Sequence, residues 1–151
     1  MKSLFLLLLL NAPLRGKSPS FIDPTGTYIL KGEIKKNRIV GHYGELRVRL
    51  LSPGTAAFCF YLNNGYPNYA SVALMDTSIY EDNHLMYKLS KDTTCTLILL
   101  FNVHDVELME IYSDPQNGCG YGPGLLIPAV FDKKSSEIPI IQDLSRQQAQ
   151  G

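Results

Sequence analysis

Apolar and polar residues alternate in short runs along most of this chain, and clusters of glycine, proline and asparagine separate the runs. The clearest example is 45–51, where Leu46, Val48 and Leu50 share one face and charged residues take the other. A period of two with one wet face predicts a half-buried antiparallel strand. No stretch of a dozen residues keeps the 3.6-residue apolar period of a helix, so the pattern predicts an all-β protein.

About eight such runs predict strands, because turn residues bound each of them. In chain order the predicted strands are 27–31, 45–51, 55–62, 71–75 and 77–80 (as two short strands or one bent strand), 84–89, 94–101, 106–112 and 125–131. The runs 55–62 and 94–101 are apolar on both faces, which predicts that they are central strands. Eight short antiparallel strands suit a small calycin-like barrel or a closed sandwich.

The N-terminus has the pattern of an export signal. Lys2 precedes an unbroken apolar run over 4–10, which is too short for the roughly 20 apolar residues that span a bilayer. Cleavage is expected after Ser18 or Ser20, where small residues offer the pattern that a signal peptidase accepts. A buried N-terminal helix or strand is the alternative. The export signal places the mature protein in the periplasm or outside the cell.

The length and this signal together predict the domain organisation. The 151 residues suit one core, and the expected parts are a signal peptide (1–20), a single β domain (21–134) and a C-terminal extension or tail (135–151). Cleavage after Ser20 leaves 11 basic against 14 acidic residues, and hence an acidic mature chain with a net charge of −3. A nucleic-acid binder normally shows a basic excess or stripe, so nucleic acid is not an expected partner. No apolar run of the mature chain is long enough to predict a transmembrane segment.

Three cysteines in an exported chain are compatible with one disulfide and one remaining thiol. If the predicted hairpin turns at 103–104, Cys95 lies opposite about Tyr112, and the residues that follow can bring Cys119 back toward it. A Cys95–Cys119 bridge is therefore predicted, and the loop-entropy model assigns it about 3 kcal/mol. Cys59 lies between two phenylalanines and is predicted to be a buried free thiol. The other pairings and a fully reduced chain stay open.

The two segments around these cysteines also carry a resemblance. They read Thr-Cys-Thr-Leu-Ile-Leu-Leu-Phe at 94–101 and Asn-Gly-Cys-Gly-Tyr-Gly at 117–122, the latter before an apolar run. This arrangement resembles small secreted bacterial β-barrel proteins of unassigned function, in which a Cys-Gly-aromatic-Gly loop precedes the last strand. The turn and strand at 23–28 fit the same pattern, so that the resemblance covers 23–134, whereas Pro-Ala at 128–129 departs from it. The resemblance implies a secreted barrel and carries no activity.

No motif in the sequence predicts a reaction, a metal or a cofactor. His42, His84 and His104 are scattered without the close spacing of a metal site, and they are expected to be exposed turn residues. The Gly-x-Ser-x-Gly signature of serine hydrolases is absent. Carboxylates such as Asp76 flank predicted strands, where solvated acids usually protect edges. The glycine-rich stretch 118–124 precedes a strand and lacks the helix or lysine that a phosphate cradle needs.

Tyrosines form the remaining candidate surface. Tyr61, Tyr66 and Tyr69 surround the predicted loop 63–68, and Tyr121 lies in the glycine-rich stretch. A tyrosine offers a large contact area with a polar end, which suits recognition of a protein or a saccharide. The binding residues predicted from this pattern are Tyr66, Tyr69 and Tyr121. Packing of the tyrosines over the barrel ends is the alternative.

The preferred function is therefore that of an exported, non-enzymatic binding or inhibitory module that acts through its loops. The alternative is a lipocalin-like carrier of a small apolar ligand. Small residues inside the barrel would favour a carrier, and an interior filled by large side chains would oppose it; the side chains in question are Phe58, Phe60, Leu97 and Leu99. A hydrolase, the third hypothesis, needs a cleft that brings a histidine against a carboxylate.

Overall fold

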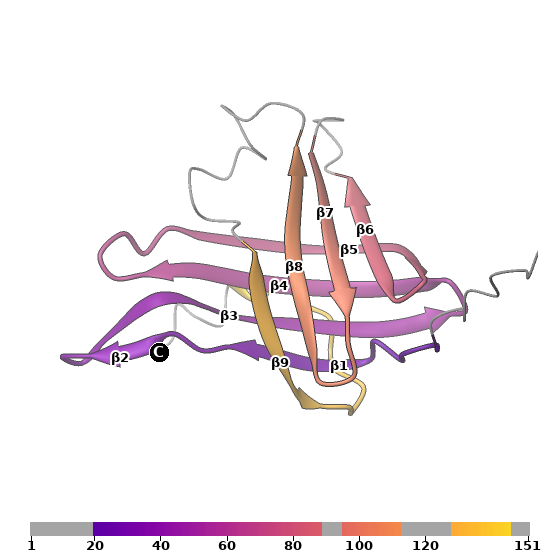
Figure 1. Cartoon of the computed structure of the whole chain (residues 1–151), viewed down its shortest axis with the longest axis horizontal. Helices are drawn as coiled ribbons and strands as arrows, with labels where there is room; N and C mark the ends of the chain where they lie inside the picture. Colours follow the sequence, from indigo (N-terminus) through magenta and orange to yellow (C-terminus); the bar gives the residue numbers. More distant parts are fainter. Residues whose placement is uncertain (1–19, 89–94, 113–127, 146–151) are drawn as a thin grey trace, which may run out of the picture.

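The computed structural model describes residues 20–88, 95–112 and 128–145 of the chain. Its regular elements are β-strands, nine of them within the described residues (Figure 1). In chain order they are β1 (Gly26–Leu30), β2 (Glu33–Lys35), β3 (Arg38–Ser52), β4 (Thr55–Gly65), β5 (Ser71–Glu81), β6 (His84–Lys88), β7 (Cys95–Phe101), β8 (Asp105–Tyr112) and β9 (Ala129–Ser135).

The strands form one closed antiparallel meander. Each strand from β3 to β9 pairs with the next one in the chain. The sheet closes because β1 pairs with β9 on one side and with β3 on the other. β2 pairs with the first residues of β3, beyond the part of β3 that pairs with β1. It is therefore an extra strand outside the closed set of eight. The described residues thus form an eight-stranded barrel with one added strand, which confirms the predicted all-β, calycin-like architecture.

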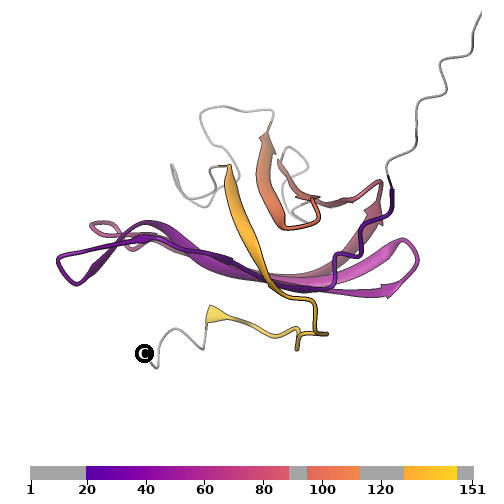
Figure 2. The ribbon, with the colours of Figure 1, turned by 60° about the horizontal axis from the view of Figure 1, so that its bottom comes forward.

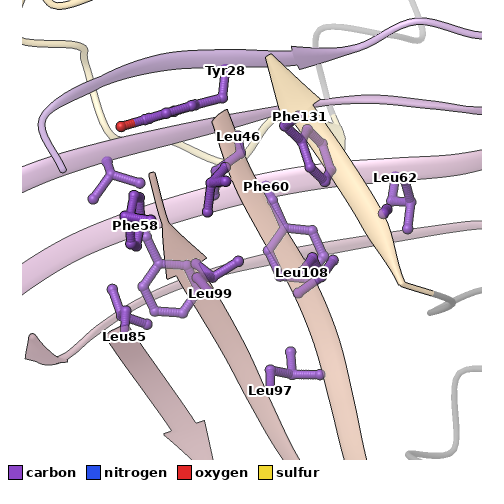
Figure 3. Close-up of a cluster of buried hydrophobic side chains, with 14 of the residues drawn as sticks. Tyr28, Leu46, Phe58, Phe60, Leu62, Leu85, Leu97, Leu99, Leu108 and Phe131 are labelled. Carbon is purple, nitrogen blue, oxygen red and sulfur yellow. The ribbon is translucent and has the colours of Figure 1, made fainter. Parts of the chain in front are cut away.

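Two crossing layers enclose the core of the barrel. In Figure 1, β1, β3, β4 and β5 run lengthwise, and β6 to β9 cross them steeply. The largest fully buried side chains come from both layers and belong to one core cluster. Those that Figure 3 labels point into the space between the layers; they are Tyr28, Leu46, Phe58, Phe60, Leu62, Leu85, Leu97, Leu99, Leu108 and Phe131. Phe101 is fully buried in the same cluster. Large side chains therefore fill the interior of this barrel.

Several local predictions are confirmed in detail. Leu46 and Val48 are buried on the inner face of β3, as their alternation predicts. The turn between β7 and β8 closes with a hydrogen bond from the Asn102 amide to the Asp105 carbonyl. That turn places Cys95 opposite Tyr112. The segments predicted as two short strands or one bent strand form the single strand β5.

The sequence prediction differs from the structure at both ends of the barrel sheet. β3 begins at Arg38, seven residues before the predicted run 45–51, and β2 was not predicted. β2 and the first residues of β3 are exposed, and Val40, His42 and Tyr43 are only partly buried, so no clear apolar alternation marks this segment. The last strand was expected over 125–131, whereas β9 continues to Ser135 because its polar end pairs with β1. Residues 113–127 lie outside the described part of the chain.

The C-terminal strap, which we define as residues 136–145, passes over the outer face of β3 and β4 (Figure 2). Leu144 packs there against Cys59 and Tyr61 of β4, and all three are buried. Arg47 Nη1 donates a hydrogen bond of 3.2 Å to the carbonyl of Ile140. The strap explains why β4 is apolar on both faces, and it packs against the barrel through Ile141 and Leu144.

The described ranges contain no helix that is long and apolar enough to cross a lipid bilayer.

Candidate binding site at the tip of the sheet

Two turns project from the same end of the long sheet layer (Figures 1 and 2). One is the β2–β3 hairpin and the other is the β4–β5 turn. We define the tip as residues 31–43 and 61–71, which contain these two turns. At the tip the rings of Tyr66 and Tyr69 meet edge to face, with their centroids 6.2 Å apart. Tyr66 is 42% exposed and Tyr69 is 48% exposed, so both rings can still contact another molecule.

A buried asparagine holds the β4–β5 turn in shape. Asn63 Nδ2 donates hydrogen bonds of 3.0 Å to the hydroxyl of Tyr61 and to the carbonyl of Tyr69. Asn63 Oδ1 accepts a hydrogen bond of 2.7 Å from the amide of Gly65. One side chain thus satisfies three groups of the turn, and such a satisfied polar network favours a single conformation.

The backbone of the β4–β5 turn also packs closely against the backbone of β3. The amide of Tyr66 donates a hydrogen bond of 2.7 Å to the carbonyl of Ile39. Gly65 has a φ of 68°, and a Cβ built on it would lie 2.5 Å from the carbonyl oxygen of Gly41. Only glycine fits this position, because a side chain would meet backbone and the φ disfavours other residues. The two turns of the tip are therefore fixed relative to one another.

A cation joins the aromatic pair. The guanidinium carbon of Arg38, at the start of β3, lies 4.5 Å from the centroid of the Tyr66 ring. This stacking leaves the N–H donors of Arg38 at the rim of an exposed aromatic surface. Tyrosine and arginine are among the residue types enriched at the positions that contribute most to the affinity of protein interfaces. Arg38 is thus a binding candidate that the sequence pattern does not predict.

Two further tyrosines support this surface from below. Tyr61 is buried, and its hydroxyl also takes part in a hydrogen bond with Tyr43 of β3. Burial, followed by the influence of Tyr61, raises the pKa of the Tyr43 hydroxyl. Tyr43 also packs with the buried cluster under the strap. The support of Tyr66 and Tyr69 is therefore continuous with the packing of the barrel.

The structure brings together two of the three predicted binding residues. Tyr66 and Tyr69 are neighbours, whereas Tyr121 lies outside the described residues. Tyr61, expected near the loop, is there, but it is buried and serves as a hydrogen-bond partner. The sequence signal that would have found Arg38 is the turn Lys35–Arg38, since it predicts a hairpin whose tip presents cations.

The cysteine prediction is tested only in part. Cys59 is a free and fully buried thiol, as predicted. Burial raises the pKa of this thiol, although hydrogen bonds with the backbone of Gln142 and Arg47 act in the other direction. Cys95 is buried where β7 begins, and Cys119 lies outside the described residues. The Cys95–Cys119 bridge stays a prediction.

The three histidines lie in different places. His42 is within β3 rather than in a turn, His84 begins β6, and His104 is in the β7–β8 turn. His84 Nδ1 lies 2.6 Å from the backbone carbonyl oxygen of Asp82. In the ranges that the structure describes, no three side chains of His, Cys, Asp or Glu are grouped closely enough to hold a metal ion.

A groove opens at the opposite end of β5, where β6 begins. Its volume is about 780 Å³, and it is lined by Thr77, Ser78, Ile79, Glu81, Asp82, His84, Met86, Tyr87, Lys88 and Ile98. The groove brings His84 near two carboxylates, as a hydrolase would require. However, the Ser78 hydroxyl donates to the carbonyl of Met86, and the imidazole contact of His84 is with backbone. Neither contact is the nucleophile–base hydrogen bond of covalent catalysis.

Comparisons with protein-family models, with curated proteins and with solved structures found no match for this chain. The predicted resemblance to secreted bacterial barrels is therefore untested.

Proposed function

We propose that the protein is an exported, non-enzymatic binding module whose contact surface is the tip. The observation that carries this proposal is the half-exposed pair Tyr66 and Tyr69 on a turn that Asn63 fixes, with Arg38 over the Tyr66 ring. Exposed aromatic rings on a preorganised turn lose little conformational entropy on binding. A partner that covers the rings therefore gains their contact area at low cost.

The filled barrel interior favours this function over that of a lipocalin-like carrier. Phe58, Phe60, Leu97 and Leu99 are all buried, and Figure 3 shows them pointing into the barrel. A carrier of a small apolar ligand needs that space for its ligand, as in barrels whose interior holds one molecule. The surface of the molecule is thus the better candidate for its function.

The test of the proposal is capture from the cell envelope of the source organism. The immobilised protein is expected to retain a partner, and the double variant Tyr66→Ala/Tyr69→Ala is expected to lose at least tenfold of it. The matched control is Ile79→Ala/Met86→Ala, which removes exposed apolar side chains from the groove. Equal retention by all three proteins would contradict the proposed contact surface. If the tyrosine variant fails to fold, Arg38→Gln replaces it as the probe of the tip.

Export has its own measurement. Fractionation of the source cells is expected to place the protein in the periplasm or the medium, with a mature N-terminus after Ser18 or Ser20. A cytoplasmic protein that retains Met1 would contradict this part of the proposal and leave the contact surface as it stands.

A further inference from the structure

The tip carries exposed apolar side chains in addition to its tyrosines. Ile34 and Ile39 pair directly across β2 and β3, and their side chains therefore lie on the same face of the hairpin. Ile34 is 78% exposed, and Ile39 is exposed as well. Two aliphatic side chains in register at the end of a projecting hairpin gain by leaving water.

The charge of the tip is opposite to that of the rest of the mature chain. Residues 31–43 contain four basic residues, which are Lys31, Lys35, Lys36 and Arg38, and one acidic residue, Glu33. Residues 61–71 contain no charged residue. All four cations are exposed, and Glu33 is paired with Lys35. The mature chain as a whole is expected to be acidic, whereas these cations are concentrated at the end of the molecule that carries the exposed isoleucines and tyrosines. This distribution favours an anionic partner.

The hairpin is built to present these groups end-on. Lys36 and Asn37 have φ values of 50° and 60°, a pair of left-handed residues that closes a tight two-residue turn. The β4–β5 turn projects from the same end, and the Tyr66 amide ties it to β3 (Figures 1 and 2). A flat surface that meets this end of the molecule can therefore touch both turns at once.

We propose that the tip docks on a lipid bilayer that carries anionic headgroups. This inference rests on the proposed function and names its partner. Ile34 and Ile39 enter the boundary of the acyl chains, Tyr66 and Tyr69 lie at the level of the headgroups, and the cations contact lipid phosphates. A saccharide offers little apolar surface to cover the isoleucines, and this favours a lipid surface over an anionic glycan.

Vesicle flotation with the mature protein tests the inference. Vesicles of phosphatidylcholine with about one third phosphatidylglycerol are expected to bind the protein at least tenfold more tightly than pure phosphatidylcholine vesicles. Lys36→Gln is expected to weaken binding about fivefold, because one cation near an anionic surface is removed. Ile34→Ser is expected to weaken it about tenfold through lost insertion. The controls Lys134→Gln and Ile79→Ser make the same changes away from the tip and are expected to leave binding within about twofold.

Two results would overturn the lipid assignment. One is equal binding to both kinds of vesicle, and the other is binding to soluble polygalacturonate, with the same dependence on Lys36, in place of vesicles. If either occurs while capture from the envelope still depends on Tyr66 and Tyr69, the binding module stands with a glycan or an acidic protein as its partner. If capture no longer depends on these tyrosines either, the tip is not the contact surface, and both proposals fail.

Discussion

Tyrosines occur in two environments in this molecule, and their contacts differ in kind. Tyr28 and Tyr80 are buried in the barrel, where their hydroxyls donate to the carbonyls of Pro24 and Ile22 at 2.8 and 2.5 Å. Tyr66 and Tyr69 at the tip are half exposed; their rings contact one another, and Arg38 lies over the Tyr66 ring. Tyr28 and Tyr80 are fixed by contacts of both their rings and their hydroxyls, whereas the rings of Tyr66 and Tyr69 keep part of their surface exposed to solvent.

This difference separates a structural role from a binding role within one residue type. A buried hydroxyl that donates to a backbone carbonyl contributes to folding, because its loss leaves the carbonyl without a partner. A half-exposed ring on a fixed turn contributes little to folding and is available to a partner. Substitutions in the two regions should therefore separate stability from binding.

The largest effect is expected in the barrel interior. Phe58 is fully buried, and its ring meets that of Tyr87 edge to face at 5.6 Å. Phe58→Ala is expected to lower the free energy of unfolding by about 3–5 kcal/mol, because it removes apolar contacts and leaves a cavity. Urea denaturation measures this change, and Phe58→Leu should lose much less. A loss under about 1 kcal/mol would mean that the interior is not a packed core.

The sequence predicts this interior well, because in a half-buried strand apolar residues alternate with polar ones and so reveal which face is buried. Leu46 and Val48 point inward because the other face of β3 is charged at Glu45 and Arg47. The residues of a turn also predict how the two strands beside it pair. The β7–β8 turn, for example, places Cys95 opposite Tyr112. Contacts that depend only on neighbouring residues are thus predictable.

The site is less predictable because it is assembled from distant segments. Arg38 meets Tyr66 only because β3 extends past the barrel to the β4–β5 turn, and the exposed or partly buried residues at the start of β3 show no alternation that would predict this extension. Leu144 follows Gln142 and Asp143 and belongs to no alternating apolar run, yet it is buried by contact with β4. No periodicity marks either contact, since each depends on tertiary packing.

The second effect concerns the outer face of β4, which the strap turns into a small core. Leu144→Ala is expected to destabilise the protein by about 2 kcal/mol, because Leu144 is buried against Cys59 and Tyr61. The loosened strap should also make the Cys59 thiol react faster with a thiol reagent in the folded state. Ile138→Ala, an exposed residue of the strap, is the matched control. Unchanged stability and thiol reactivity in the Leu144 variant would show that the strap does not protect β4.

The third effect sharpens the role of the core hydroxyls. Tyr80→Phe is expected to cost about 1 kcal/mol near neutral pH, because the carbonyl of Ile22 loses its donor. Burial, followed by the nearby Asp23 charge, raises the pKa of Tyr80 from 10.0 to about 12. Burial also raises the pKa of Tyr28. Denaturation midpoints measured from neutral to alkaline pH give the stability cost of Tyr80→Phe and the pH dependence that the raised pKa values cause.

The sign of the pH dependence follows from these directions. Between pH 10 and about 12 the unfolded chain loses the Tyr80 proton while the folded chain keeps it, so stability falls as pH rises. The stabilising effect is fully present below pH 10. The fall should be shallower in Tyr80→Phe and shallower still when Tyr28→Phe is added. An identical alkaline profile in the wild type and both variants would contradict the role of these hydroxyls.

The smallest effect on stability is expected at the tip. Tyr66→Ala and Tyr69→Ala should each change the free energy of unfolding by no more than about 0.5 kcal/mol, since both rings are half exposed. The matched variant Asn63→Ala should cost about 1–3 kcal/mol, because it leaves buried groups of the same turn without partners. Urea denaturation of the three variants compares the rings with their support. Losses as large for the tyrosines as for Asn63 would assign the rings to packing and remove the distinction between tip and core.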